Sequence, residues 1–160
     1  MEARANYITP AGFARLRARY EELFAVERPK LVETISWAAG NGDRSENGDY
    51  IYGRKRLREI DRELGWLSKR MKAAQVVDPA KQPDRGRVFF GATVTIVDEE
   101  DRERVVTLVG EDEADAGEGR ISWRSPIARA LRGAAIGDLR RVDLPGGARE
   151  HEVLAIRYPD

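Results

Sequence analysis

The chain has 160 residues, of which 35% are charged and 41% hydrophobic, and its formal net charge is zero. This composition predicts a soluble, folded protein of one domain or two small ones. The absence of cysteine and the single histidine, His151, exclude disulfides, thiolate metal sites and cysteine nucleophiles, and argue against a histidine-based centre. No signal peptide or membrane-spanning apolar run is visible, so we expect a cytoplasmic protein with no membrane partner.

The charge is divided unevenly along the chain. Residues 1–75 hold 15 Lys and Arg against 11 Asp and Glu, a net of +4, and residues 76–160 hold 13 against 17, a net of −4. Such a division indicates two modules with different partners, although a bias of this size also arises by chance.

The first 76 residues predict two helices. Thr9 caps the first, Pro10 opens it, and Pro29 should kink it. Its apolar face comprises Phe13, Leu16, Tyr20, Leu23, Leu31, Ile35 and Ala38. The second helix carries a coiled-coil seam of Leu57, Ile60, Leu64, Leu67 and Met71. We therefore expect an antiparallel coiled-coil hairpin over residues 1–76, roughly 40 Å long at 1.5 Å per residue.

Residues 77–86, with two prolines and a glycine, predict a linker. After it the apolar period changes to 2, which is typical of half-buried strands. These strands are expected around Val94 and Ile96, around Val106 and Leu108, and around Leu154, Ile156 and Tyr158. One short helix begins at Ser125-Pro126 and ends at Gly133, and Pro145-Gly146-Gly147 predicts a hairpin turn. The fold class is therefore α+β, with an antiparallel sheet and one short helix over residues 87–160.

The loop over residues 40–50 joins the two helices at the far tip of the hairpin. It carries three acidic residues at spacings of three: Asp43, Glu46 and Asp49. Carboxylates that converge near a helix N-terminus are stabilised by its dipole and suit Mg²⁺. The same Asn, Gly, Asp and Ser content also suits an ordinary capping loop, and composition alone does not separate the two.

A calcium loop is the other metal interpretation of this segment. Aligned to an EF-hand, Asp43, Ser45 and Asn47 take the first ligand positions and Gly48 the turn glycine. The twelfth position, which needs a bidentate Glu, is Arg54. A cation at this position, the strongest ligand position of the loop, argues against a calcium loop.

A dense run of cations follows the tip: Arg54, Lys55, Arg56 and Arg58. Helical geometry places Arg54 and Arg58 on one face with Lys55 beside them. The run predicts a phosphate-binding stripe within about 15–20 Å of the acidic tip. A solvated coiled-coil flank is the alternative, because Glu59, Asp61 and Glu63 are interspersed nearby.

The segment NGDRSENGDYIYGRKRLREIDREL resembles the tip and second helix of Gre family transcript-cleavage factors, and its Arg-Ser and basic run resemble the GreB branch. The resemblance continues in VFFGATVTIV, LVGEDE and SPIARALRGAAIGD. It implies a coiled-coil hairpin joined to a C-terminal domain of FKBP-like fold. It also implies an accessory factor, not an enzyme, that enters the secondary channel of bacterial RNA polymerase and stimulates its Mg²⁺-dependent cleavage of backtracked RNA.

The resemblance assigns roles to particular residues. Asp43 and Glu46 match the acidic pair that shares Mg²⁺ with the polymerase active site. Arg54, Lys55, Arg56 and Arg58 match the patch that contacts the displaced RNA 3′ segment. Asp112, Ser125 and Pro126 match positions that dock at the channel rim, although Ser-Pro is equally a good helix start. Mg²⁺ is expected only in the polymerase complex, and the free protein is expected to be a monomer.

One position departs from the family pattern, because Gly48 stands where alanine is usual. Glycine there costs about 0.5–1 kcal/mol of helix stability. Two other functions remain to be weighed. A channel regulator could inhibit polymerase without promoting cleavage, which the intact Asp43 and Glu46 oppose, and a free-standing nuclease would need more ligands than two carboxylates. An isomerase role would rest on fold analogy alone.

Overall fold

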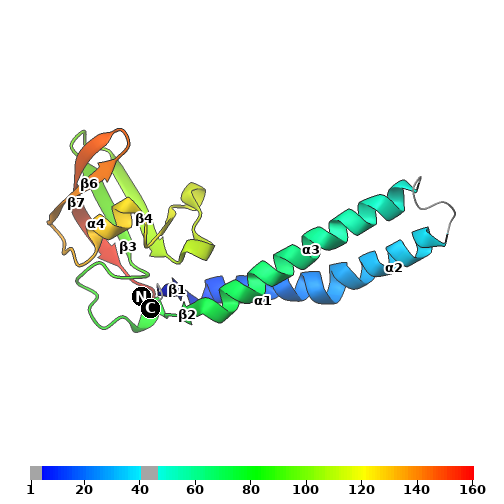
Figure 1. The fold of residues 1–160 in the computed structure, drawn as a ribbon. Helices are drawn as coiled ribbons and strands as arrows, with labels where there is room; N and C mark the ends of the chain where they lie inside the picture. Colours follow the sequence, from blue (N-terminus) through cyan, green and yellow to red (C-terminus); the bar gives the residue numbers. More distant parts are fainter. Residues whose placement is uncertain (1–4, 41–46) are drawn as a thin grey trace. The chain divides into compact units, whose positions relative to one another are not determined.

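The computed structural model describes residues 5–40 and 47–160 (Figure 1). It divides into two compact units. One comprises Phe13–Ala73, and the other combines the segment through Gly12 with Ala74–Asp160. The first unit is helical and the second is built on a sheet, which confirms the α+β class expected from the sequence.

The helical unit is an antiparallel hairpin. Its first arm comprises α1 (Pro10–Glu22, whose first turn belongs to the sheet unit), the π-helical turn η1 (Leu23–Glu27) and α2 (Arg28–Ala39). Its second arm is α3 (Gly48–Ala73), which packs against α2. The predicted seam is confirmed, because its central residues are buried: Leu16, Leu23, Ala38, Ile60, Leu64 and Leu67. Burial of these side chains supplies the main free energy that holds the two arms together.

Gly53 marks a close approach of the two arms. A Cβ atom at this position would lie 2.7 Å from Cγ1 of Ile35, which is nearer than two carbon atoms can pack. Gly53 is therefore the residue that lets α3 lie directly on the Leu31–Ile35 turn of α2.

A π-helical turn, η1, precedes Pro29, the residue that was predicted to kink this arm. The amide of Arg28 donates to the carbonyl of Leu23, five residues back, instead of four. Leu31 follows Leu23 by eight residues, so in a regular α-helix it would lie about 80° round the axis from Leu23. The π turn holds one residue more than an α-helical turn, which cancels most of this rotation. The apolar residues around Leu23 and those around Leu31 therefore both face α3.

The second unit holds two sheets. In the smaller, β1 (Asn6–Ile8) pairs in parallel with β2 (Ala74–Val76). The larger has the strand order β5-β4-β3-β7-β6. Its strands are β3 (Thr93–Asp98), β4 (Glu103–Val109), β5 (Arg120–Ser122), β6 (Leu139–Leu144) and β7 (Gly147–Arg157). Neighbours pair antiparallel, as predicted, except that β5 runs parallel to β4, so the sheet is mixed.

One short helix, α4 (Pro126–Leu131), covers the core of this sheet. The predicted cap is confirmed, since Ser125 Oγ accepts the amide of Ala128 at 3.3 Å and Pro126 opens the helix. The predicted turn is also confirmed, because Leu144 pairs with Gly147 across Pro145-Gly146. Three 3₁₀ turns complete the unit: η2 (Pro79–Lys81), η3 (Glu111–Glu113) and η4 (Ala116–Glu118).

The predicted inward face of the last strand is wrong in part. Val153 is fully buried whereas Leu154 is only half-buried, although Ile156 and Tyr158 do face the core. The register shifts between Thr95 and Ile96, which pair with Ala155 and Val153, so Leu154 is left over as a β-bulge. A bulge inserts one residue and exchanges inward and outward positions beyond it.

Glu113 fastens the N-terminal segment to the sheet unit. Its carboxylate, on a buried side chain, accepts the amides of Thr9 at 2.8 Å and of Gly110 at 2.9 Å, and also the hydroxyl of Thr9. The same hydroxyl caps α1 by accepting the amide of Gly12 at 3.1 Å, which confirms the predicted cap. The helix start is therefore fixed by a buried acid from η3.

Candidate functional site

Asn47 closes the connection between α2 and α3. Its Oδ1 accepts the amide of Tyr50 at 3.2 Å, and its Nδ2 donates to the carbonyl of Ala38 at 2.6 Å. One side chain therefore satisfies the start of α3 and the end of α2. The predicted metal-binding pair, Asp43 and Glu46, lies just before this cap and outside the described residues. Asp49, in the first turn of α3, is exposed.

The predicted cationic stripe follows on α3. Arg54, Lys55 and Arg58 are exposed and form no ion pair with any acidic residue in the described part of the chain. Arg54 and Arg58 are one helical turn apart, and Lys55 adjoins them. These three charges are available to a phosphate backbone.

Arg56 has different surroundings from its neighbours. It is half-buried, and its guanidinium lies 3.6 Å from Glu27 and 3.4 Å from Glu59. Glu27 also contacts Arg19 at 3.3 Å, and Arg19 Nε donates to Glu63 at 2.8 Å, so Arg56 belongs to an ion-pair network between the two arms. The hydrogen bond that Arg19 donates to Glu63 is the main factor that raises the pKa of Arg19.

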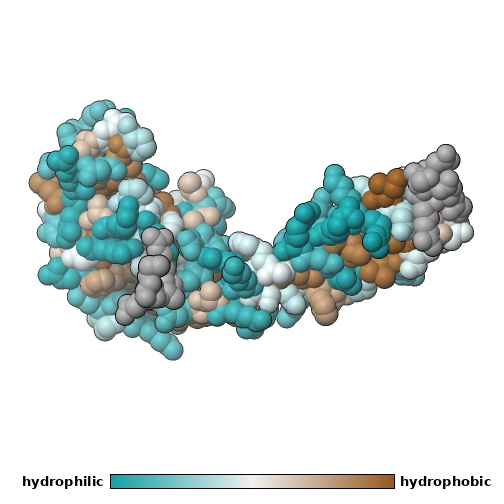
Figure 2. Space-filling view, viewed as in Figure 1, coloured by the Kyte–Doolittle hydropathy of each residue, from teal (hydrophilic) through white to brown (hydrophobic). Residues whose placement is uncertain are grey.

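Exposed apolar side chains accompany the stripe. Ile51 and Tyr52 on α3 are 53% and 68% exposed, and Trp37 on α2 is 64% exposed. Figure 2 shows apolar surface on the hairpin near its α2–α3 connection. Ile51 and Tyr52 are separated from the exposed cations only by Gly53, so this part of α3 presents both charge and apolar area.

The predicted docking residues lie in the sheet unit. Asp112 is in η3, half-buried, and accepts a hydrogen bond from Asn6 Nδ2 at 3.4 Å. Ser125 is half-buried at the start of α4, and Pro126 beside it is exposed. η3 packs against β5, the strand that leads into Ser125, so the three residues come from neighbouring elements.

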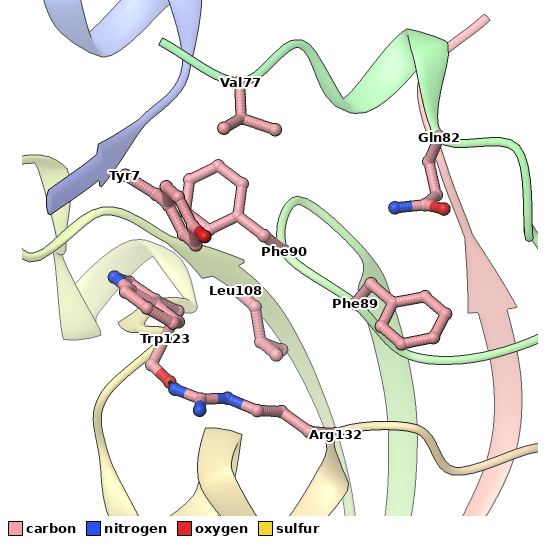
Figure 3. Close-up of a pocket in the computed structure, with 8 residues that line it drawn as sticks. All are labelled: Tyr7, Val77, Gln82, Phe89, Phe90, Leu108, Trp123 and Arg132. Atoms are coloured by element: carbon pink, nitrogen blue, oxygen red, sulfur yellow. Dashed lines mark hydrogen bonds between the residues drawn. The ribbon is translucent and has the colours of Figure 1, made fainter. Parts of the chain in front are cut away.

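An aromatic pocket near Ser125 was not foreseen from the sequence. It encloses about 410 Å³ (Figure 3). Its lining residues are Tyr7, Val77, Gln82, Phe89, Phe90, Leu108, Trp123 and Arg132. The rings of Tyr7 and Trp123 are 4.6 Å apart and those of Tyr7 and Phe90 5.7 Å apart. The pocket escaped prediction because its rings come from separate segments, each with an unremarkable sequence pattern.

Two features were not found among the described residues. Residues 5–40 and 47–160 contain no group of three or more acidic, histidine or cysteine side chains arranged to hold a metal ion. Over the same residues, none of the helices has the length and apolar character needed to cross a membrane.

Comparison with known proteins accounts for both units. The model of the "Transcription elongation factor, N-terminal" family matches residues 6–76, and that of "Transcription elongation factor, GreA/GreB, C-term" matches residues 82–158. The chain belongs to the GreA/GreB family.

Relatives from both branches align over nearly its whole length. Transcription elongation factor GreB of Neisseria meningitidis serogroup B is 50% identical over 96% of this chain and 94% of its own length. Transcription elongation factor GreA of Alkalilimnicola ehrlichii is 41% identical over 94% of this chain and 96% of its own length. Among solved structures, the GreA factor homolog 1 (Gfh1) of Thermus thermophilus covers 96% of this chain and 99% of its own, at 22% identity and a TM-score of 0.43.

Family membership confirms the class of function expected from the sequence. The chain is a GreB-type transcription elongation factor, and such factors stimulate transcript cleavage by RNA polymerase. Gre factors are accessory proteins and do not catalyse the reaction themselves.

Proposed function

We propose that this Gre factor stimulates cleavage of backtracked RNA by inserting its hairpin into the secondary channel of RNA polymerase, with Asp43 and Glu46 presented to the active site. The observation that carries the proposal is the position of these residues. In the sequence they stand between the two arms of the hairpin, just before the Asn47 cap.

The chemistry of the donor set fits a shared ion. Mg²⁺ requires near-octahedral oxygen coordination, and two carboxylates fill only part of it. Asp43 and Glu46 would hold the ion together with polymerase carboxylates, and the bound ion would supply charge neutralisation and an activated water. The chain itself would contribute two negative charges from the segment that joins α2 and α3.

The exposed cations on α3 support an RNA contact. We assign Arg54, Lys55 and Arg58 to the displaced 3′ segment, because their charges are free of ion pairs with the described residues. Arg56 also belongs to the predicted patch, but its pairing with Glu27 and Glu59 gives it a second role between the arms. Docking at the channel rim is assigned to Asp112, Ser125 and Pro126.

The deciding experiment is a cleavage assay on stalled, backtracked complexes with a defined RNA 3′ end. Wild-type protein should accelerate release of the 3′ fragment, and the Asp43→Asn, Glu46→Gln double variant should bind polymerase without accelerating it. Occupancy of the channel by wild-type protein with slower elongation and no cleavage would instead identify an inhibitory regulator.

A further inference from the structure

The exposed side of α3 continues well past the cationic stripe. Steps of three and four residues lead along it through exposed side chains only, and such steps keep residues on one face of a helix. The residues of this face, which we call the outer face of α3, are Lys55, Arg58, Arg62, Trp66 and Lys69. From its first to its last residue it is about 21 Å long at 1.5 Å per residue, and α3 is unbroken over this length (Figure 1).

The positive charge of the outer face is not neutralised by the described part of the chain. Its four cations form no ion pair with a carboxylate among residues 5–40 and 47–160. The acids in the middle of α3 have other partners: Glu63 accepts Nε of Arg19 at 2.8 Å, and Asp61 accepts Nε of Arg28 at 2.9 Å. The third of them, Glu59, contacts an arginine of its own helix. A surface sorted in this way favours a polyanion.

Trp66 is the aromatic residue of the outer face. Its side chain is 51% exposed, and it forms no ring–ring or cation–ring contact with the described residues. Arg62 lies one turn before it and Lys69 one turn after it. The neighbouring Gly65 leaves open space, because a Cβ atom there would meet nothing within 4 Å. The indole is therefore accessible from solvent between two exposed cations.

An accessible indole between cations fits single-stranded nucleic acid better than an acidic protein surface. Cations at intervals along a helix follow the phosphates of a strand, and an indole stacks on any base because every base has a π-face. Carboxylates of a protein would pair with the cations, but they would leave the indole without a stacking partner. The combination of charge and ring thus favours RNA.

We propose that Trp66 stacks on a base of the displaced RNA 3′ segment, with Arg62 and Lys69 binding phosphates on either side of that base. The identity of the RNA rests on the function proposed above, in which this segment lies along the stripe. Trp66 is about 17 Å further along α3 than Lys55, so only RNA that extends past the stripe reaches it. Trp66 is therefore a positioning residue for long displaced RNA and has no part in the cleavage of short RNA.

The contact is tested directly by photo-cross-linking in backtracked complexes. The displaced RNA carries 4-thiouridine at successive positions, and the factor is the full chain with Asp43→Asn and Glu46→Gln, which should bind without cleaving. We expect cross-links to Trp66, identified by mass spectrometry, only from thiouridines far from the RNA 3′ end. Cross-links from every position to other residues, with none to Trp66, would overturn the proposal.

Cleavage rates of substituted proteins test the stacking itself. At subsaturating factor, Trp66→Leu should slow cleavage of long displaced RNA about five-fold or more and leave short RNA unaffected. Trp66→Tyr should restore most of the rate, because a phenol ring also stacks. Trp37→Leu is the matched control, since Trp37 is a 64% exposed tryptophan of the same hairpin but lies on α2. Thermal melts verify that each variant is folded.

Three results would contradict the proposal. Equal rates for Trp66→Leu and wild type on long RNA would overturn the stacking, as would equal impairment of Trp66→Tyr and Trp66→Leu. The same loss on long and short RNA, with weaker binding to polymerase that holds no displaced RNA, would assign the outer face to a protein surface instead. The proposed function fails separately, if wild-type protein does not stimulate cleavage of short displaced RNA.

Discussion

Arg56 Nη2 lies 3.6 Å from Glu27 Oε1, so a residue of the cationic stripe is joined to the opposite arm of the hairpin. The stripe is therefore not uniform. Three of its members face solvent, and the fourth joins α3 to η1 through Glu27 while also contacting Glu59 on its own helix. This difference lets the RNA contact and the integrity of the hairpin be tested separately.

The first prediction concerns the free cations. Replacing Arg54, Lys55 and Arg58 with alanine should slow cleavage of long displaced RNAs more than short ones, since only longer RNA lies along the stripe. Arg56→Ala should instead lower hairpin stability by up to about 1 kcal/mol. Cleavage rates on two RNA lengths and thermal melts measure the two effects. Equal loss on both RNAs would show that the cations position the hairpin.

The second prediction concerns the acidic pair. Asp43→Asn or Glu46→Gln should abolish stimulated cleavage and leave polymerase binding nearly unchanged, because each keeps side-chain volume and removes a ligand charge. Cleavage is followed on backtracked complexes at limiting Mg²⁺, and binding by competition with wild-type protein. Asp49→Asn, an exposed acid in the same region, serves as the control for a general loss of charge. Retained cleavage in the double variant would refute the assignment.

The third prediction is that the chain alone leaves RNA intact. Incubation with labelled RNA and Mg²⁺, without polymerase, should release no fragments, since two carboxylates cannot complete a magnesium site. The measurement is gel analysis over hours with polymerase-free preparations. Cleavage that disappears in Asp43→Asn would identify a nuclease in its own right.

The fourth prediction uses three glycines of one helix, α3. Gly53→Ala should destabilise the hairpin by about 1–3 kcal/mol, because its methyl group would overlap Ile35. Gly65→Ala, with no atom within 4 Å of the added Cβ, should stabilise α3 by about 0.5–1 kcal/mol. Gly48→Ala, also unobstructed, should raise stability less, because it opens the helix. Chemical denaturation gives all three values, and a stabilised Gly53→Ala would disprove the close approach.

The fifth prediction tests the attachment of the N-terminal segment. Glu113→Gln replaces an acceptor of three hydrogen bonds with a group that has one acceptor oxygen, so it should cost about 1–3 kcal/mol. Glu118→Gln, at an exposed pair with Arg120, should cost no more than about 1 kcal/mol. Denaturant titration separates the two, and equal losses would mean that Glu113 is not the organising acid.

The sequence was most informative where long periodic patterns meet strong caps. The α3 seam, the Thr9 and Ser125 caps and the Pro145-Gly146 turn were all predictable, because local chemistry decides each of them. β1 and β2 were missed, since three-residue strands that pair across the whole hairpin leave no local pattern. The bulge at Leu154 was missed because a period of 2 does not reveal an inserted residue.

The candidate site was predictable to different degrees. The cations of α3 were visible in the sequence, but the separate role of Arg56 depends on a partner from η1, which only folding supplies. The arginines around α4 left a faint signal, because residues 119–137 contain four arginines and no acidic residue. The aromatic pocket left none, since Tyr7 and Trp123 come from segments far apart in the sequence.

Because of the π-helical turn η1, the number of residues in the first arm determines which way its apolar face points. Each residue added to or removed from an α-helix rotates everything beyond it by about 100°. Deleting Ala25 would therefore turn Ile35 and Ala38 away from α3 unless η1 tightened into an ordinary turn, and Pro29 would then crowd the carbonyl four residues before it. Homologous hairpins that are one residue shorter here are thus expected to have an ordinary α-helical turn in place of η1. The apolar residues beyond that turn would then still face the second arm.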